Sequence, residues 1–131
     1  MKTILVDAVY CLVSEEGKIF KEMFDLLETY PNRKIVLTGA DEEGFKKFKL
    51  DTVPYEVFTL KHNPEKTDSK YYEIMLSNFN LKKEDVVYFE HGKEAVKSAE
   101  KVGIKTYFYD DEVKDLKSLK KFLDENLEIG E

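Results

Sequence analysis

The chain has 131 residues, of which 42% are hydrophobic and 13% aromatic, so it can bury the core of one domain and is not a disordered segment. Acidic residues outnumber basic ones by 27 to 21 and no block of basic residues stands out, which argues against nucleic acid as the main partner. The single cysteine, Cys11, excludes an intrachain disulfide and a cysteine-based zinc site. We expect it to be a small core residue, because no histidine can be assigned next to it.

The N-terminus has a lysine followed by the apolar run Ile4–Val13, which superficially resembles a secretion signal. Asp7 interrupts this run and no small-residue cleavage pattern follows it, so we interpret it as the first strand of the fold. No apolar stretch reaches the roughly 20 residues that cross a bilayer. We therefore expect a cytoplasmic protein without a membrane partner, with one domain over residues 1–127 and a polar tail at 128–131 that frays.

The first half of the chain alternates strand and helix patterns. Thr3–Val6 predicts a buried strand, and apolar residues at helical spacing predict an amphipathic helix over Lys18–Tyr30. Lys34–Thr38 predicts a second buried strand that ends at a glycine. A short helix is expected over Asp41–Lys49 with the aspartate as its cap, and Tyr55–Leu60 predicts a third strand with the alternation of an edge position.

The second half of the chain continues the alternation. A polar loop, Lys61–Thr67, precedes a helix that Asp68 is expected to cap. After this helix come, in order, a strand at Val86–Phe89, a helix that ends at Gly103, a strand at Ile104–Tyr109 and a last helix. The apolar face of the first of these helices carries Ala95, Val96, Ala99 and Val102, and that of the last helix carries Leu116, Leu119, Phe122 and Leu123.

Strands that alternate with helices predict an α/β fold in which helices cover both faces of a parallel five-stranded sheet, a three-layer sandwich. In such sheets ligands bind outside the carboxyl ends of the strands. Asp7, Thr38 and Glu90 each lie at the end of a predicted strand, His91 follows directly, and Lys66 lies in the polar loop after the third strand. A strand-end position would let Asp7 face a ligand rather than be buried, which would explain a carboxylate in an apolar run.

An aspartate, a hydroxyl, a lysine and an acidic residue at strand ends, in this order, resemble the haloacid dehalogenase-like (HAD) superfamily. The resemblance covers nearly the whole chain and is strongest over Lys66–Tyr109, where a lysine, a capped helix, a strand, an acidic turn, an A-V-x-x-A helix, a glycine and a strand follow one another. The segment KIVLTG also fits the family's strand that ends in serine or threonine. The resemblance implies a HAD-like Rossmannoid fold of the capless type, with strand order 5-4-1-2-3.

The resemblance also implies a role for each residue. Asp7 matches the nucleophile that attacks phosphorus and becomes an aspartyl phosphate. Thr38 matches the hydroxyl that hydrogen-bonds the transferring phosphoryl group. Lys66 matches the lysine that offsets charge on the nucleophile and the phosphate, with Lys61 as a second candidate.

A magnesium ion is implied by the same resemblance, and phosphoryl transfer independently requires concentrated positive charge. Asp7, the backbone carbonyl of Val9, and Glu90 or His91 fall at the positions that would hold this ion. Histidine is a poor ligand for Mg²⁺ and a good one for softer metals, so another divalent metal is expected if His91 is a ligand.

Two positions depart from the family's pattern. The family opens with Asp-x-Asp, and Val9 stands where the second aspartate, the general acid, would be. Loss of a general acid lowers a rate by about 10²–10⁴. Glu90 and His91 stand where the family has Asp-Asp or Gly-Asp. Both changes fall on the catalytic machinery, so we expect low or specialised activity.

We therefore expect a relative of the HAD-type hydrolases that cleaves phosphate monoesters of a small molecule through Asp7. The alternative is a non-catalytic HAD-like domain that binds a phosphorylated ligand or a protein partner. Dehalogenation ranks third, because neither the segment after Cys11 nor Gly39–Tyr55 has room for a helical cap. A receiver domain of two-component signalling ranks lower, because the chain lacks an acidic pair in the first strand and a mid-chain acceptor aspartate.

Each of these residues also has an ordinary structural explanation. Asp7 could bind local amides or pair with a lysine, and Thr38 could simply form a turn with the following glycine. Lys66 could be a solvated loop charge, and Glu90–His91 could cap the next helix. His62 is expected to be solvated rather than catalytic.

Overall fold

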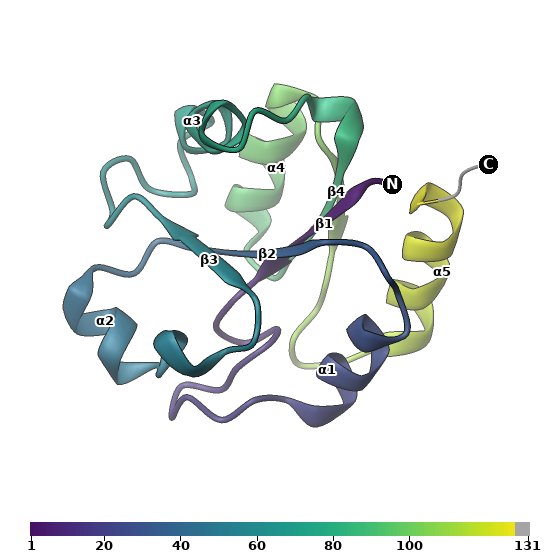
Figure 1. Ribbon diagram of the computed structural model, residues 1–131, viewed down its shortest axis with the longest axis horizontal. Coiled ribbons are helices and arrows are strands. Elements are labelled where there is room, and N and C mark those ends of the chain that lie inside the picture. The colour runs from purple at the N-terminus through teal and green to yellow at the C-terminus, as the bar shows by residue number, and fades with distance from the viewer. Residues whose placement is uncertain (128–131) are drawn as a thin grey trace.

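The computed structural model describes residues 1–127, and its centre is one parallel sheet (Figure 1). The strand order is β3-β2-β1-β4-β5, which confirms the predicted order. The strands are β1 (Thr3–Asp7), β2 (Lys34–Thr38), β3 (Glu56–Thr59), β4 (Val86–Glu90) and β5 (Lys105–Phe108). Their bounds lie within one residue of the predicted ones. Val6 pairs with both Val36 and Phe89, so β1 is the central strand.

Helices connect consecutive strands and cover both faces of the sheet, as Figure 1 shows. They are α1 (Lys21–Glu28), α2 (Glu42–Lys47), α3 (Lys70–Asn78), α4 (Lys93–Val102) and α5 (Leu116–Leu127), with 3₁₀ turns at Leu50–Thr52 and Lys83–Asp85. The fold is therefore the predicted three-layer α/β sandwich.

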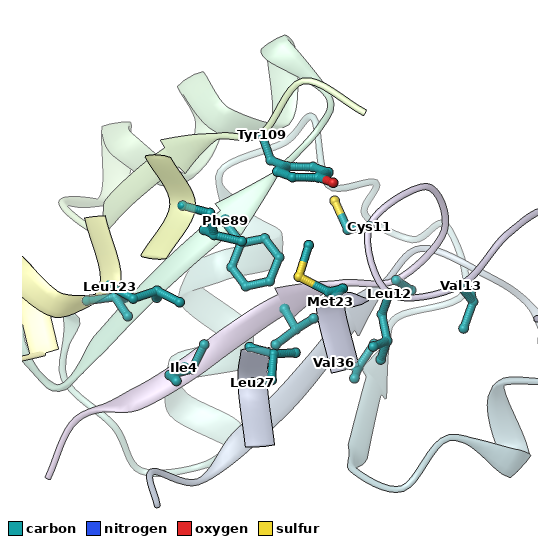
Figure 2. Close-up of a cluster of buried hydrophobic side chains, with 14 of the residues drawn as sticks. Ile4, Cys11, Leu12, Val13, Met23, Leu27, Val36, Phe89, Tyr109 and Leu123 are labelled. Carbon is teal, nitrogen blue, oxygen red and sulfur yellow. The ribbon is translucent and has the colours of Figure 1, made fainter. Parts of the chain in front are cut away.

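Successive side chains of β1 point to opposite faces of the sheet and pack against the helices on each face. Ile4 and Val6 pack with α1 and α5 in one core cluster, which Figure 2 shows in part. Leu5 points to the other face and packs in a second cluster with α3 and α4. All three side chains are fully buried, and each contributes about 1.5–3 kcal/mol relative to an exposed position.

Two helix starts differ from the prediction. The first helix begins at Lys21 rather than Lys18, because Val13 forms an antiparallel bridge with Ile19 and the amide of Phe20 donates to the carbonyl of Leu12 at 2.8 Å. These bonds keep the preceding residues extended. At the third helix, Asp68 lies one position too early to be the N-cap, although its carboxylate does accept from the amide of Lys70 at 2.9 Å.

Two predicted helix ends are present. Asp41 caps α2, its carboxylate accepting from the amide of Gly44 at 2.9 Å, but this helix stops at Lys47 and a 3₁₀ turn follows. Gly103 ends α4 with a φ of 96°, a left-handed conformation that favours glycine.

No helix within residues 1–127 is long and apolar enough to span a membrane. The polar tail expected at 128–131 lies outside the described residues.

Candidate active site

A pocket of about 400 Å³ opens at the carboxyl ends of the central strands. The strands run in parallel, so the residues that end them meet at one edge of the sheet. Asp7 ends β1, Thr38 ends β2 and Glu90 ends β4, and all three line this pocket. Lys66 enters from the loop between β3 and α3, and His91 follows β4 directly. The structure thus brings together the side chains that the sequence pointed to.

Lys66 forms the centre of the polar cluster. Its Nζ atom lies 2.7 Å from Oδ1 of Asp7 and 2.8 Å from Oε1 of Glu90, and it donates to the carbonyl of Leu37 at 3.1 Å. Both carboxylates have side chains only 3% exposed, and that of Lys66 is 13% exposed. This places Lys66 in an ion-pair network rather than in solvent. Lys61 does not take its place, since it pairs with Glu42 outside the pocket.

Asp7 is buried, contrary to the expectation that a strand-end position would leave it free of the core. Burial acts to raise the pKa of Asp7, but the nearby charge of Lys66 and the contact with His91 outweigh it and hold the pKa well below its usual range. The pKa of Lys66 is raised well above its usual value, because the charges of Asp7 and Glu90 outweigh the effect of burial. Asp7 therefore stays a carboxylate at neutral pH, the form that a nucleophile needs.

Glu90 has a different electrostatic setting. Burial, followed by the charge of Asp7, raises the pKa of Glu90 despite the opposing effect of Lys66. Its Oε1 atom also accepts from the hydroxyl of Tyr88, and its Oε2 atom accepts from the amide of Gly92 at 2.9 Å. These contacts fix both oxygens of Glu90 beside Asp7.

His91 contacts the second oxygen of Asp7. Its Nδ1 atom forms a hydrogen bond with Oδ2 of Asp7 and lies 3.4 Å from Oε2 of Glu90. The backbone amide of His91 donates to the same Asp7 oxygen at 3.2 Å. The hydrogen bond to Asp7 raises the pKa of His91 above its usual value. The imidazole of His91 therefore rests on the carboxylate oxygens that Lys66 leaves free.

These oxygens suit a divalent cation. Oδ2 of Asp7 and Oε2 of Glu90 lie on either side of Nδ1 of His91. Val9 lines the same pocket. Carboxylate and carbonyl oxygens are the ligands that Mg²⁺ prefers. Asp7, Glu90 and the carbonyl of Val9 would therefore hold Mg²⁺ once the ring of His91 moves aside, whereas a softer metal would keep His91 as a ligand.

Cys11 lies closer to this cluster than the sequence indicated. It is buried as predicted, but its thiol donates to Oδ2 of Asp7 at 3.3 Å, and one ligand atom each of Asp7, Cys11 and His91 lie within 4.8 Å of one another. The expectation that no histidine lies beside Cys11 was therefore wrong. Burial raises the pKa of Cys11 well above its usual value, so the thiol stays protonated.

Thr38 lines the pocket and also forms two hydrogen bonds within the protein. Its hydroxyl oxygen accepts from the amide of Ala40 at 3.1 Å, and its carbonyl accepts from the hydroxyl of Tyr71 at 2.8 Å. The hydroxyl proton is not used by either contact and could donate to a phosphoryl oxygen. The turn and the phosphate contact proposed for Thr38 are therefore compatible.

Four pocket residues were missed or misplaced by the sequence reasoning. Tyr10 and Glu15 reach the rim from the segment after β1, and His62 and Glu65 from the loop before Lys66. The ring of Tyr10 packs edge-on against that of His91, with centroids 5.1 Å apart. His62 is half-exposed, as expected, but it pairs with Glu65 at 2.9 Å within the pocket lining. For His62 and Glu65, the sequence signal was their position in the same loop as Lys66.

The sequence matches no family model and no curated protein. Solved structures do match. An uncharacterised protein from Corynebacterium glutamicum aligns over 100% of this chain and 98% of its own, with a TM-score of 0.70 and 15% identity. A HAD family enzyme from Bacteroides thetaiotaomicron, solved with magnesium and inorganic phosphate, aligns over 82% of this chain and 93% of its own, with a TM-score of 0.66 and 12% identity.

The core domain of a protein assigned as a phosphoglycolate phosphatase, from Streptococcus pneumoniae, aligns over 80% of this chain and 77% of its own, with a TM-score of 0.55 and 16% identity. Similarity at this level of identity shows the fold alone. Together with the observed strand order, it confirms that the chain has the fold of the HAD-like superfamily.

Proposed function

We propose that this protein hydrolyses phosphate monoesters through an aspartyl phosphate at Asp7, with a bound divalent cation. The observation that carries the proposal is the contact of 2.7 Å between Lys66 and an ionised Asp7 at the base of an open pocket. It is supported by the HAD-like fold and by a structural neighbour that was solved with magnesium and phosphate.

Each side chain has a separate role in the proposed phosphoryl transfer. The carboxylate of Asp7 attacks phosphorus, and Lys66 offsets the negative charge that collects on the attacking group and the phosphoryl oxygens. The hydroxyl of Thr38 donates to one of these oxygens. A divalent cation held by Asp7, Glu90 and the carbonyl of Val9 would supply the remaining positive charge.

The charge of the pocket favours a divalent cation. Four carboxylates line it, against one lysine and two histidines. A phosphate dianion would enter a region of net negative charge, which is unfavourable without a further cation. Mg²⁺ between Asp7 and Glu90 would meet this need, and a softer divalent metal would do so if His91 remains a ligand.

The pocket also limits the kind of substrate. The connections at this edge, Ala8–Phe20 and the region of α2, contain no helical domain that could close over it, which supports the capless type. Such an open pocket admits a small phosphorylated molecule and is also compatible with a macromolecular substrate. Val9 carries no acid, so a basic leaving group must obtain its proton from another residue. We therefore expect activity that is low or restricted to particular leaving groups.

The direct test is turnover of 4-nitrophenyl phosphate with Mg²⁺, Mn²⁺, Co²⁺ or Zn²⁺. We expect metal-dependent release of phosphate that falls to background in Asp7→Asn and is unchanged in the control Asp25→Asn, whose carboxylate pairs with Lys21 on the surface. No turnover with any metal, or equal turnover in Asp7→Asn, would contradict the proposal. Tight binding of phosphate esters without hydrolysis would instead support the non-catalytic alternative.

A further inference from the structure

The leaving oxygen of an alkyl phosphate is strongly basic, so its departure requires a proton donor within the pocket. The residues around Asp7 are poorly suited to this task. Lys66 and Cys11 hold their protons because the pKa of each is raised well above its usual value. The Nδ1 atom of His91 is already engaged in a hydrogen bond with Asp7 itself. Tyr10 holds its proton too, since a hydrogen bond to Glu15 raises its pKa.

His62 is placed differently. It lines the same pocket as Asp7, and its Nδ1 atom lies 2.9 Å from Oε1 of Glu65. This contact orients the ring and leaves Nε2, which has no hydrogen-bond partner among residues 1–127, available to another molecule. An imidazole exchanges protons readily near neutral pH, and a carboxylate on its other nitrogen fixes which nitrogen carries the transferable proton.

The backbone holds this pair against the end of β2. A Cβ atom placed on Gly39 would lie 3.4 Å from Oε1 of Glu65 and 3.5 Å from Nδ1 of His62, so the pair packs directly over the residue that follows Thr38. Lys61 and His62 have φ angles of 53° and 66°, a left-handed conformation that is uncommon for non-glycine residues. The loop therefore has an uncommon backbone conformation at His62, and this residue lines the same pocket as Asp7.

We propose that His62, oriented by Glu65, is the general acid and base of the reaction, a role that Val9 cannot fill. This inference rests on the proposed function. As Asp7 attacks phosphorus and the bond from phosphorus to the leaving oxygen breaks, the proton on Nε2 of His62 passes to that oxygen and an alcohol departs. Neutral His62 then takes a proton from the water that attacks the aspartyl phosphate, which releases phosphate and regenerates Asp7 and protonated His62.

The test compares two substrates that differ in their need for a proton, 4-nitrophenyl phosphate and ethyl phosphate. His62→Gln keeps a polar side chain of similar size but cannot transfer a proton. We expect it to lower the rate of leaving-group release in the first turnover by about 10²–10⁴-fold on ethyl phosphate and by about tenfold or less on 4-nitrophenyl phosphate. The later breakdown of the aspartyl phosphate is common to both substrates and should slow equally with both. Glu65→Gln, which weakens the orientation of the ring, should show the same selectivity to a smaller degree.

Lys61→Gln is the matched control, because it removes a charge from the same loop outside this pocket. It should leave both rates unchanged, and thermal unfolding should confirm that all variants are folded. An equal loss of first-turnover release on both substrates, or no such loss on ethyl phosphate, would overturn the assignment of His62. Absence of wild-type turnover on both substrates, or turnover that survives Asp7→Asn, would overturn the proposed function and this assignment with it.

Discussion

Lys66 bridges Asp7 and Glu90, with its Nζ atom 2.7 Å from one carboxylate and 2.8 Å from the other. The three side chains come from separate parts of the chain and are largely buried. In the proposed reaction, one lysine therefore both stabilises the fold and pairs with the nucleophile. Removing it should affect stability and activity together.

We predict that Lys66→Met lowers the free energy of unfolding by about 3–5 kcal/mol, because it leaves two buried carboxylates without their counter-charge. Urea denaturation followed by circular dichroism measures the change. Lys21→Met, which removes an exposed lysine from an ion pair within α1, is the control and should leave the midpoint almost unchanged. Equal midpoints for the two variants would show that Lys66 contributes no more than a surface charge.

Tyr88 and Tyr109 are both buried but differ in their hydrogen bonds, so loss of the hydroxyl should change the stability of the protein differently at the two positions. Tyr88 donates to Glu90 from a fully buried position, so Tyr88→Phe should cost about 1–3 kcal/mol. The buried hydroxyl of Tyr109 points toward Cys11 (Figure 2) and has no hydrogen-bond partner within the described part of the chain. Tyr109→Phe should therefore leave stability unchanged or raise it. Chemical denaturation of both variants tests this, and a cost for Tyr109→Phe equal to that for Tyr88→Phe would contradict it.

His91 should make stability depend on pH. Its pKa in the folded protein is raised, chiefly by the hydrogen bond to Asp7, so its pairing stabilises the fold in full below the unfolded-state pKa of about 6.5. This contribution is lost as the pH rises through the higher folded-state pKa. Proton NMR measures that pKa directly, because the chain has only two histidines and His62→Gln assigns both signals. In Asp7→Asn the pKa of His91 should fall, and an unchanged value would contradict the account of its cause.

Divalent cations should compete with His91. Mg²⁺ bound to Oδ2 of Asp7 and Oε2 of Glu90 would displace the ring, so its addition should lower the pKa of His91 and shift its NMR signals. Glu90→Gln should weaken this response to Mg²⁺. Signals of His91 that do not move at Mg²⁺ concentrations that support turnover would contradict the assigned metal ligands. Removal of the metal with a chelator should restore the original signals.

The sheet and the meeting of its polar residues could be predicted from the sequence. Apolar β-branched runs alternated with helical spacing, and this pattern has few arrangements other than a parallel sheet. The ends of such strands lie together, so Asp7, Thr38 and Glu90 had to share one edge. Lys66 could be placed from its position just before a helix.

The finer features of the site could not be predicted, because they depend on contacts between distant residues. His62 and Glu65 stand in a polar loop that resembles an ordinary solvated connection, and only folding brings them over Gly39. Asp7 is buried, and the segment after β1 folds back through isolated bridges that leave no periodic pattern in the sequence. The contact of His91 with Asp7 spans 84 positions and has no local signature.

In the proposed reaction, Asp7 becomes covalently phosphorylated during turnover. The most direct measurement is borohydride reduction of the protein quenched during turnover of 4-nitrophenyl phosphate with Mg²⁺, followed by mass spectrometry of the peptide that contains Asp7. An aspartyl phosphate is reduced to homoserine, so we predict homoserine at this position in the wild-type chain and its absence when substrate is withheld. Turnover without any reduction product at Asp7 would contradict the account.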